Sequence, residues 1–303
     1  MKITKEDILN TGNLELLAKK AVEGFITGLH KSPFHGFSVE FAEHRQYNQG
    51  ESTKNIDWKL YGRTDKLYNK IFDEETNLRS QFLIDVSASM QIANEGELSK
   101  LQHAIWSTAV LTQILKKQRD ASGICFFDNK IQEYTKIASS GRHYKELIYK
   151  LNDYLHYESK VGSTDISTTL HNIASQIHKR SMIILFTDFL EKDRDLEPVF
   201  EAIKHLKHNK HEVIVFQTVN SASELDFDYG NRPMTFEDVE TGVEIKLLPS
   251  EVKDAYAAKM KKYNADLKSK LNQYKIEYAL VDTSQDVKNA ILPFLIKRKS
   301  MTR

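Results

Sequence analysis

The sequence predicts an α/β protein in which a central, mostly parallel sheet has helices on both faces. Short apolar runs, which are typical of buried strands, recur along the chain from residue 80 onward. Segments with apolar residues at helical spacing lie between most of these runs. Because parallel strands need long crossover connections, this alternation indicates βαβ units with helices on both faces of one sheet.

The expected elements follow one another in a regular order. Strands are expected at 81–86, 123–127, 131–137, 182–186, 213–219 and 277–281. Helices are expected from 99, at 143–155, 165–178, 196–203 and 251–274, and from 285. Ser99 and Gln102 have the spacing of a capping box and mark the start of the first of these helices. The tight Asp128-Asn129 connection between the second and third strands predicts a hairpin at one edge of the sheet. Pro293 lies inside the last expected helix and weighs against its continuity.

The chain is expected to have three parts. Residues 1–79 would form an N-terminal helix and a polar, aromatic extension that packs on the core, with strands at 37–41 and 66–72. Residues 80–298 would form the α/β domain, and residues 299–303 a tail. A polar insertion at 221–246, expected to hold a small hairpin, interrupts the domain.

Composition restricts the class of protein. The 303 residues include 43 Lys and Arg against 42 Asp and Glu, a net charge of +1, which predicts no nucleic-acid partner. No apolar run approaches the roughly 18 residues of a membrane span, and the start of the sequence lacks the apolar core of a signal peptide. The sequence therefore predicts a cytoplasmic protein without a membrane span.

Polar side chains follow two of the expected strands and precede one helix. Asp85, Ser87 and Ser89 come at the end of the first core strand, and Asp188 follows the most apolar strand. Thr164 stands just before a helix. Because ligands of open parallel sheets bind beyond the carboxyl ends of the strands, we expect these five residues to converge on one edge of the sheet.

The five side chains offer only oxygen ligands, which suit a hard cation such as Mg²⁺ or Mn²⁺. If the neutral hydroxyls of Ser87, Ser89 and Thr164 make the direct contacts, the ion keeps much of its charge and attracts an acidic ligand from outside. Asp85 and Asp188 would balance the charge directly or through water. Asp and Ser after a strand are also common turn formers and helix caps, so an isolated Asp-x-Ser-x-Ser would mean little. The combination in this order predicts a metal site.

Asp85-x-Ser87-x-Ser89, Thr164 and Asp188 resemble the metal-ion-dependent adhesion site of von Willebrand factor A domains. The resemblance covers the chain from about Ser80 to Phe294 and implies a Rossmann-like domain of that type. In such sites an Asp or Glu of the partner protein completes the coordination of the ion.

The upstream segment resembles a second signature. Arg45 to Glu51, Ile56 to Lys59 and Gly62-Arg63 are similar to the motif of the bacterial family known as domain of unknown function 58. Glu51, Lys54 and Gly62 depart mildly from that motif. Members of the family often accompany MoxR-type AAA+ ATPases and are thought to act with them in chaperone-like assembly. The resemblance thus implies a non-enzymatic protein–protein interaction module with such an ATPase as its partner.

Two rival functions have to be weighed. A scaffold with a purely structural cation would use the same residues. Only the effect of Thr164→Ala on partner capture distinguishes such a scaffold from metal-dependent adhesion. A Mg²⁺-dependent phosphatase of the haloacid dehalogenase type also places an Asp after its first strand and another after a later strand. It needs a second carboxylate two residues after the first Asp, where this chain has Ser87, and no lysine motif is visible.

Overall fold

A computed structural model of the chain describes residues 8, 13–28, 41–48, 53, 56–72, 78–94, 96–159, 166–190, 196–208, 210–238 and 242–301. The chain forms two compact units, one of residues 1–34 and 78–303 and one of residues 35–77.

A six-stranded sheet forms the centre of the larger unit. Its strands are β3 (Arg79–Asp85), β4 (Ala121–Phe127), β5 (Ile131–Tyr134), β6 (Met182–Thr187), β7 (Glu212–Val219) and β10 (Glu277–Asp282). Their spatial order is β10-β7-β6-β3-β4-β5, and all neighbouring strands are parallel except β4 and β5. The predicted mostly parallel sheet is confirmed, and so is the hairpin at its edge.

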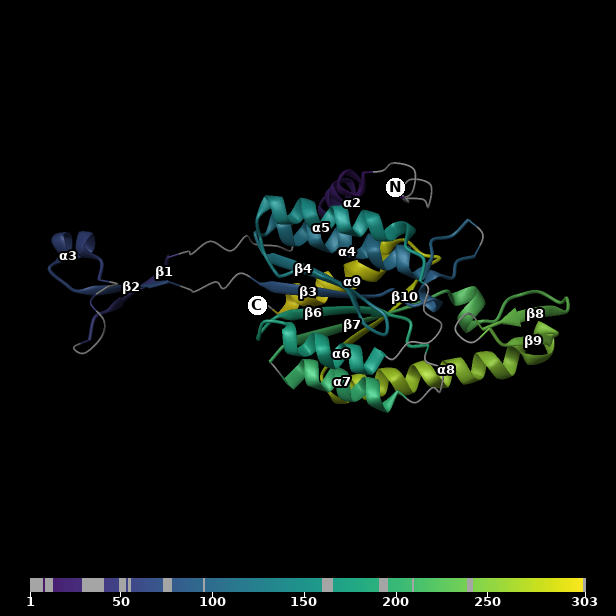
Figure 1. The fold of residues 1–303 in the computed structure, drawn as a ribbon. Helices are drawn as coiled ribbons and strands as arrows, with labels where there is room; N and C mark the ends of the chain where they lie inside the picture. The colour runs from purple at the N-terminus through teal and green to yellow at the C-terminus, as the bar shows by residue number, and fades with distance from the viewer. Residues whose placement is uncertain are drawn as a thin grey trace. The chain divides into compact units, whose positions relative to one another are not determined.

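Helices cover both faces of this sheet (Figure 1). One face carries α4 (Lys100–Lys117), α5 (Gly141–Asp153) and α9 (Val287–Met301), and α2 (Leu14–Gly28) packs on α4 and α5. The other face carries α6 (Ile166–Gln176), α7 (Glu197–His208) and α8 (Pro249–Gln273). α9 continues through Pro293, so the last expected helix is not interrupted there.

The strands divide their side chains between two hydrophobic cores. Ile84 and Phe186 belong to the core under α2, α4, α5 and α9, whereas Leu83 and Leu185 belong to the core on the opposite face. Alternate side chains of a strand point to opposite faces of the sheet, so strands covered on both faces become continuously apolar. This is why the central strands read as apolar runs without alternation.

The N-terminal helix α2 is part of the larger unit. Leu14, Leu17, Ala18 and Val22 are buried in the same core as the apolar side chains of α4 and α5. They recur at helical spacing, so α2 presents one apolar face to the domain.

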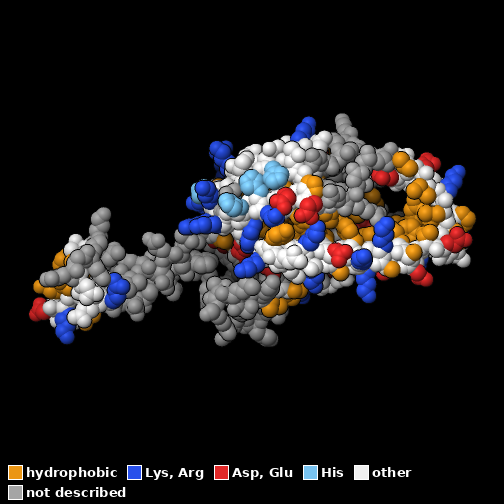
Figure 2. Space-filling view, turned by 90° about the horizontal axis from the view of Figure 1, so that it is seen from below, with side chains coloured by type: hydrophobic (Ala, Val, Ile, Leu, Met, Phe, Trp, Pro, Cys, Tyr) orange, Lys and Arg blue, Asp and Glu red, His pale blue; other side chains and the backbone are white. Residues whose placement is uncertain are grey.

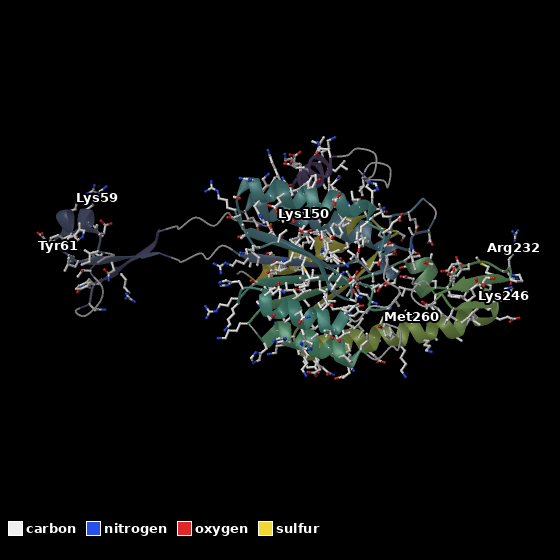
Figure 3. The ribbon with its side chains drawn as sticks, in the orientation of Figure 1. Lys59, Tyr61, Lys150, Arg232, Lys246 and Met260 are labelled. Carbon is white, nitrogen blue, oxygen red and sulfur yellow. The ribbon has the colours of Figure 1, made fainter. Side chains whose placement is uncertain are left out.

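The smaller unit contains an antiparallel pair, β1 (Phe41–Gln46) and β2 (Tyr68–Phe72), and the short helix α3 (Trp58–Thr64). Of the strand expected at 37–41, residues 37–40 lie outside the described residues. Asp57 caps α3, since its carboxylate accepts hydrogen bonds from the amides of Lys59 and Leu60 at 3.0 and 3.1 Å. Lys59 and Tyr61 project from this helix (Figure 3). The expected packing of the extension on the core stays a prediction.

The insertion after β7 begins with one π-helical turn, η4 (Ser221–Leu225). It continues into an antiparallel hairpin of β8 (Met234–Glu237) and β9 (Glu244–Leu247), which leads into α8. The small hairpin expected in residues 221–246 is therefore confirmed.

Candidate functional site

Two of the predicted carboxylates lie at the ends of neighbouring parallel strands. Asp85 is the last residue of β3, and Asp188 directly follows β6. β4, which follows β3 in the chain, lies on one side of β3 in the sheet, whereas β6 lies on the other side of β3. The carboxyl ends of β3 and β6 therefore border the point where the strand order reverses, which is the usual ligand position in open α/β sheets.

Asp85 is completely buried. One carboxylate oxygen accepts a hydrogen bond from the amide of Ser87 at 2.9 Å, and the other accepts one from the hydroxyl of Thr187 at 2.7 Å. Burial raises the pKa of Asp85 to about 7, and the nearby charge of Asp188 adds to the rise. A carboxylate in this position is costly to ionise unless a positive charge is close.

The two serine hydroxyls lie next to this carboxylate. Ser87 and Ser89 are both buried, and their Oγ atoms are 3.1 Å apart. Ser89 begins the short 3₁₀ helix η2 (Ser89–Gln91), which turns its hydroxyl back toward Ser87. The fifth predicted residue, Thr164, lies outside the described residues, so its place at this site stays a prediction.

A lysine that the sequence did not point to binds Asp188. The Nζ atom of Lys100 donates to Oδ2 of Asp188 at 2.7 Å and also to Oε1 of Glu224 in η4. Lys100 and Asp188 are both only 1% exposed. Burial alone would lower the pKa of Lys100, but Asp188 and Glu224 outweigh it and raise the pKa above its ordinary value.

The start of α4 positions this lysine. The Ser99 hydroxyl accepts from the amide of Gln102, and the Gln102 side chain accepts from the amide of Ser99, both at 3.1 Å. The predicted capping box is thus confirmed. It fixes Lys100 as the first helical residue, with its side chain directed into the interior.

Glu224 is held by the loop that follows β7. Its second carboxylate oxygen accepts from the amide of Asn220 at 2.9 Å, and the Asn220 side chain donates to Glu97 at 2.6 Å. Asp188 and Glu224 thus place two carboxylates on the ammonium of Lys100, and the carboxyl group of Asp85 lies near that of Asp188. The described part of the site carries more negative than positive charge and attracts cations.

The donor set fits a hard divalent cation in one respect and conflicts with it in another. Among the described residues, no three His, Cys, Asp or Glu side chains are grouped to hold a metal ion. A metal here would therefore depend on the hydroxyls of Ser87 and Ser89 beside Asp85, and oxygen donors of this kind suit Mg²⁺ or Mn²⁺. Lys100 competes for Asp188, so a divalent ion could use that carboxylate directly only if the ammonium moved.

Two cavities lie near the ends of the strands. One of about 420 Å³ lies beside η2, and its lining includes Gln91, Ser99, Gln102 and Tyr157. Gln91 joins the loops around it, because its side chain donates to the carbonyl of Val86 at 3.2 Å and accepts from the amide of Ser159 at 3.0 Å. This cavity adjoins the loop that carries the two serines.

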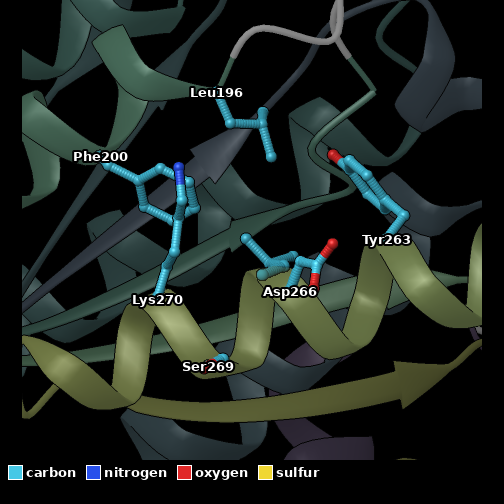
Figure 4. A pocket seen from close by; sticks show the side chains of 7 residues that line it. Leu196, Phe200, Tyr263, Asp266, Ser269 and Lys270 are labelled. Carbon is cyan, nitrogen blue, oxygen red and sulfur yellow. The ribbon is translucent and has the colours of Figure 1, made fainter.

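The second cavity, of about 370 Å³, separates the start of α7 from α8 (Figure 4). Tyr263, Asp266 and Lys270 project from α8 toward Leu196 and Phe200. The Tyr263 hydroxyl donates to the carbonyl of Phe189 at 2.6 Å, so the wall of this cavity contacts the loop that carries Asp188.

Fold and site together define an α/β protein with an acidic, oxygen-rich cluster at the carboxyl edge of a mostly parallel sheet. The chain belongs to the family described as protein of unknown function DUF58, whose model matches residues 43–266.

Uncharacterized proteins of Mycobacterium bovis and Mycobacterium tuberculosis are similar to this chain along most of its length. Each is 21% identical over 289 residues, which cover 94% of this chain and 88% of the relative. These relatives are uncharacterized and suggest no activity.

Three solved structures also resemble the chain. They are the conserved hypothetical protein BatB from Bacteroides thetaiotaomicron (17% identity, TM-score 0.44), an aerotolerance-related membrane protein from Bacteroides fragilis (18%, 0.43) and an uncharacterized membrane spanning protein from Vibrio fischeri (14%, 0.24). They cover 74%, 73% and 73% of this chain, and the matches span 100%, 100% and 98% of those chains.

The prediction of a cytoplasmic protein is corrected by these likenesses, because two of the three structures are described as membrane proteins. Composition and the absence of a long apolar run cannot exclude association with a membrane. Among the helices that the structure describes, none combines the length and the apolar character that a membrane crossing requires.

Proposed function

We propose that this chain is a non-enzymatic protein–protein interaction module with a von Willebrand factor A-type domain. Asp85, Ser87, Ser89, Thr164 and Asp188 would hold one Mg²⁺ or Mn²⁺ ion in an adhesion-type site. The observation that carries the proposal is the burial of two carboxylates, Asp85 and Asp188, at the ends of adjacent parallel strands beside paired serine hydroxyls.

Each residue of the site has a distinct task in this proposal. Ser87 and Ser89 offer neutral oxygen donors, so they bind a cation without cancelling its charge. Asp85 supplies charge from within the protein, where its hydrogen bonds to Ser87 and Thr187 fix its orientation. A bound divalent cation would supply a positive centre to which a carboxylate of the partner can bind.

The excess of negative charge makes the proposed binding of an acidic partner residue dependent on the metal ion. An Asp or Glu of a partner that approached Asp85, Asp188 and Glu224 without a cation would be repelled, since like charges at short range disfavour association. A partner that binds through an acidic residue therefore needs the ion. A scaffold with a structural cation would not show this dependence.

The proposed partner is a MoxR-type AAA+ ATPase, with which the module would act in chaperone-like assembly. The similarity of residues 45–63 to the family motif supports this choice. The phosphatase alternative loses one objection, because Lys100 stands beside Asp188. The other objection remains, because Ser87 occupies the position of the general acid/base and its hydroxyl cannot take that role near neutral pH.

The test is capture of a purified MoxR-type ATPase on immobilised protein, with Mg²⁺ and with a chelator, for wild type and Thr164→Ala. The proposal expects capture by wild type in Mg²⁺ only, and loss of capture by Thr164→Ala at a nearly unchanged melting temperature. Capture that ignores both the chelator and the substitution would favour the scaffold with a structural cation.

A further inference from the structure

The β8–β9 hairpin carries an apolar face that the domain covers only at Phe236 and leaves exposed at Met234 and Ile245. Paired residues of an antiparallel sheet share a face, so Met234 and Leu247 lie on the same face as Phe236 and Ile245. Met234 is 39% exposed and Ile245 57% exposed, and Val243, which precedes β9, is 56% exposed. Figure 2 shows hydrophobic side chains gathered at the end of the domain that carries the hairpin, with acidic side chains at the border.

An aromatic cluster beneath the hairpin holds this face in place. The ring of Phe227 is buried and contacts Phe236 at 5.2 Å between centroids and Tyr256 of α8 at 4.6 Å. Tyr229 contacts both Phe227 and Phe236. The hairpin is therefore fixed to the start of α8 by aromatic packing, so its exposed apolar side chains form a surface of defined shape.

The hairpin lies in an acidic segment, residues 221–254, of a chain that is otherwise basic. Residues 221–254 contain nine Asp and Glu but only three Lys and Arg, whereas the whole chain has a net charge of +1. The exposed acidic residues of the segment are Asp226, Asp228, Glu237, Asp238, Glu244, Glu251 and Asp254. A surface with this charge attracts basic partners and repels acidic ones.

Two of these carboxylates face each other across the hairpin. Glu237 of β8 pairs directly with Glu244 of β9 on the polar face of the sheet. Like charges directly opposite each other destabilise a strand pair, and a basic side chain placed between them would remove the repulsion. Lys246 shares this face and projects with Arg232 from the same end of the domain (Figure 3).

The hairpin also offers main-chain groups. Among the described residues its sheet has only two strands, so the outer edge of each strand has no strand partner. Extended peptides add to exposed edges through main-chain hydrogen bonds, while side chains of alternate residues reach the two faces. One face here is apolar and the other carries the paired glutamates.

From these relationships we propose that the β8–β9 hairpin is a docking surface for an extended segment of a partner protein with alternating apolar and basic residues. The segment adds as a third strand. Its apolar side chains cover Met234, Val243 and Ile245, and its basic side chains bind Glu237 and Glu244. This surface is separate from the oxygen cluster at the ends of β3 and β6 and does not depend on a metal.

The test uses a fluorescently labelled synthetic peptide of alternating valine and lysine, titrated with the full chain. Binding is expected for this peptide and not for one of alternating valine and glutamate. Methylation of the backbone amide nitrogens along both edges of the peptide should abolish binding, because it removes the main-chain donors. Equal binding of the methylated peptide would overturn the addition of a strand.

Substitutions locate the site. Ile245→Ser and Val243→Ser should each weaken the peptide about tenfold, and Glu237→Gln with Glu244→Gln should do so by a similar factor. Ile296→Ser on α9 is the matched control, since Ile296 is 49% exposed on another surface, and it should leave affinity unchanged. Val243 precedes β9, so Val243→Ser tests the surface even if Ile245→Ser loosens the hairpin.

Three further results would overturn the proposal. One is wild-type affinity in both apolar variants, and another is an equal loss of affinity in Ile296→Ser. The third is binding of the chain to phosphatidylcholine vesicles through Val243 and Ile245 without any binding of the peptide, which would assign the apolar face to a lipid surface.

Discussion

Lys100 and Asp188 form a buried ion pair, with Nζ 2.7 Å from Oδ2 and each side chain only 1% exposed. The two residues are 88 positions apart and come from the start of α4 and the end of β6. The pair places a cation of the protein itself on one of the proposed metal ligands. It thereby connects the proposed metal site to Glu224 and to the beginning of the insertion.

Replacing this lysine should be costly and should make stability depend on metal. Lys100→Met leaves the buried Asp188 and the half-buried Glu224 without their cation, and removing one partner of a buried pair typically costs about 3–5 kcal/mol of unfolding free energy. Mg²⁺ should recover part of this loss, because a ligand that binds only the folded state stabilises it. Urea denaturation with and without Mg²⁺ measures both effects.

Lys204→Met is the control, because Lys204 forms an exposed ion pair with Glu201 on α7. It should leave the unfolding free energy unchanged and independent of Mg²⁺, since exposed ion pairs contribute little. If Lys100→Met is as stable as Lys204→Met, the ion pair does not support this edge of the sheet.

Gly123 of β4 is required for close packing against β3 and against Thr135, which follows β5. A Cβ atom at this position would lie 2.6 Å from the side-chain oxygen of Gln81 and 2.9 Å from the carbonyl oxygen of Thr135. Gly123→Ala should therefore lower the unfolding free energy by about 1–3 kcal/mol, as overpacking does. Gly141 at the start of α5 meets no atom within 4 Å, and Gly141→Ala should be neutral or stabilise by up to about 1 kcal/mol. Equal effects of the two substitutions in thermal denaturation would contradict this packing.

His103 of α4 should make stability depend on pH. It is buried, and burial lowers its pKa to about 4, against the opposing influence of the Gln285 backbone, Asp282 and Asp286. Above pH 6.5 the ring is neutral in both states and contributes nothing. As pH falls from 6.5 to 4, the unfolded chain takes up a proton that the folded chain does not, so the unfolding free energy falls by about 3 kcal/mol. Below pH 4 the effect is constant.

His103→Gln removes this contribution. The difference in unfolding free energy between wild type and the variant should therefore change between pH 7 and pH 4, in the direction that disfavours wild type. A difference that stays constant over this range in urea titrations would show that the folded state protonates His103 as easily as the unfolded chain does.

Much of the fold could be predicted because strand and helix patterns depend on local sequence. The apolar run of β6 and the capping box at Ser99 required no knowledge of the tertiary structure. Asp85 and Asp188 could be placed together because the carboxyl ends of parallel strands meet at one edge. Pro293 does not interrupt α9, because packing of Ile291, Phe294 and Leu295 against the core outweighs the local preference to interrupt the helix.

Lys100 and Glu224 could not be found by the same reasoning. A lysine at the start of a helix is usually solvated, and its burial depends on the loops after β6 and β7, which come together only in the folded sheet. One signal was available, because a cation at a helix N-terminus opposes the helix dipole and needs a compensating charge. The end of β7 also lies at this edge, so residues 220–224 belonged among the candidates.

The most direct test of the metal site is a calorimetric titration of metal-free protein with Mg²⁺ and Mn²⁺, for wild type, Ser87→Ala and Ser80→Ala. Ser80 is the matched control, because it is a buried serine at the opposite end of β3. The account predicts saturable binding of about one ion per chain in wild type and Ser80→Ala, and its loss in Ser87→Ala. Absence of binding in folded wild type, or unchanged binding in Ser87→Ala, would contradict a metal site built on these hydroxyls.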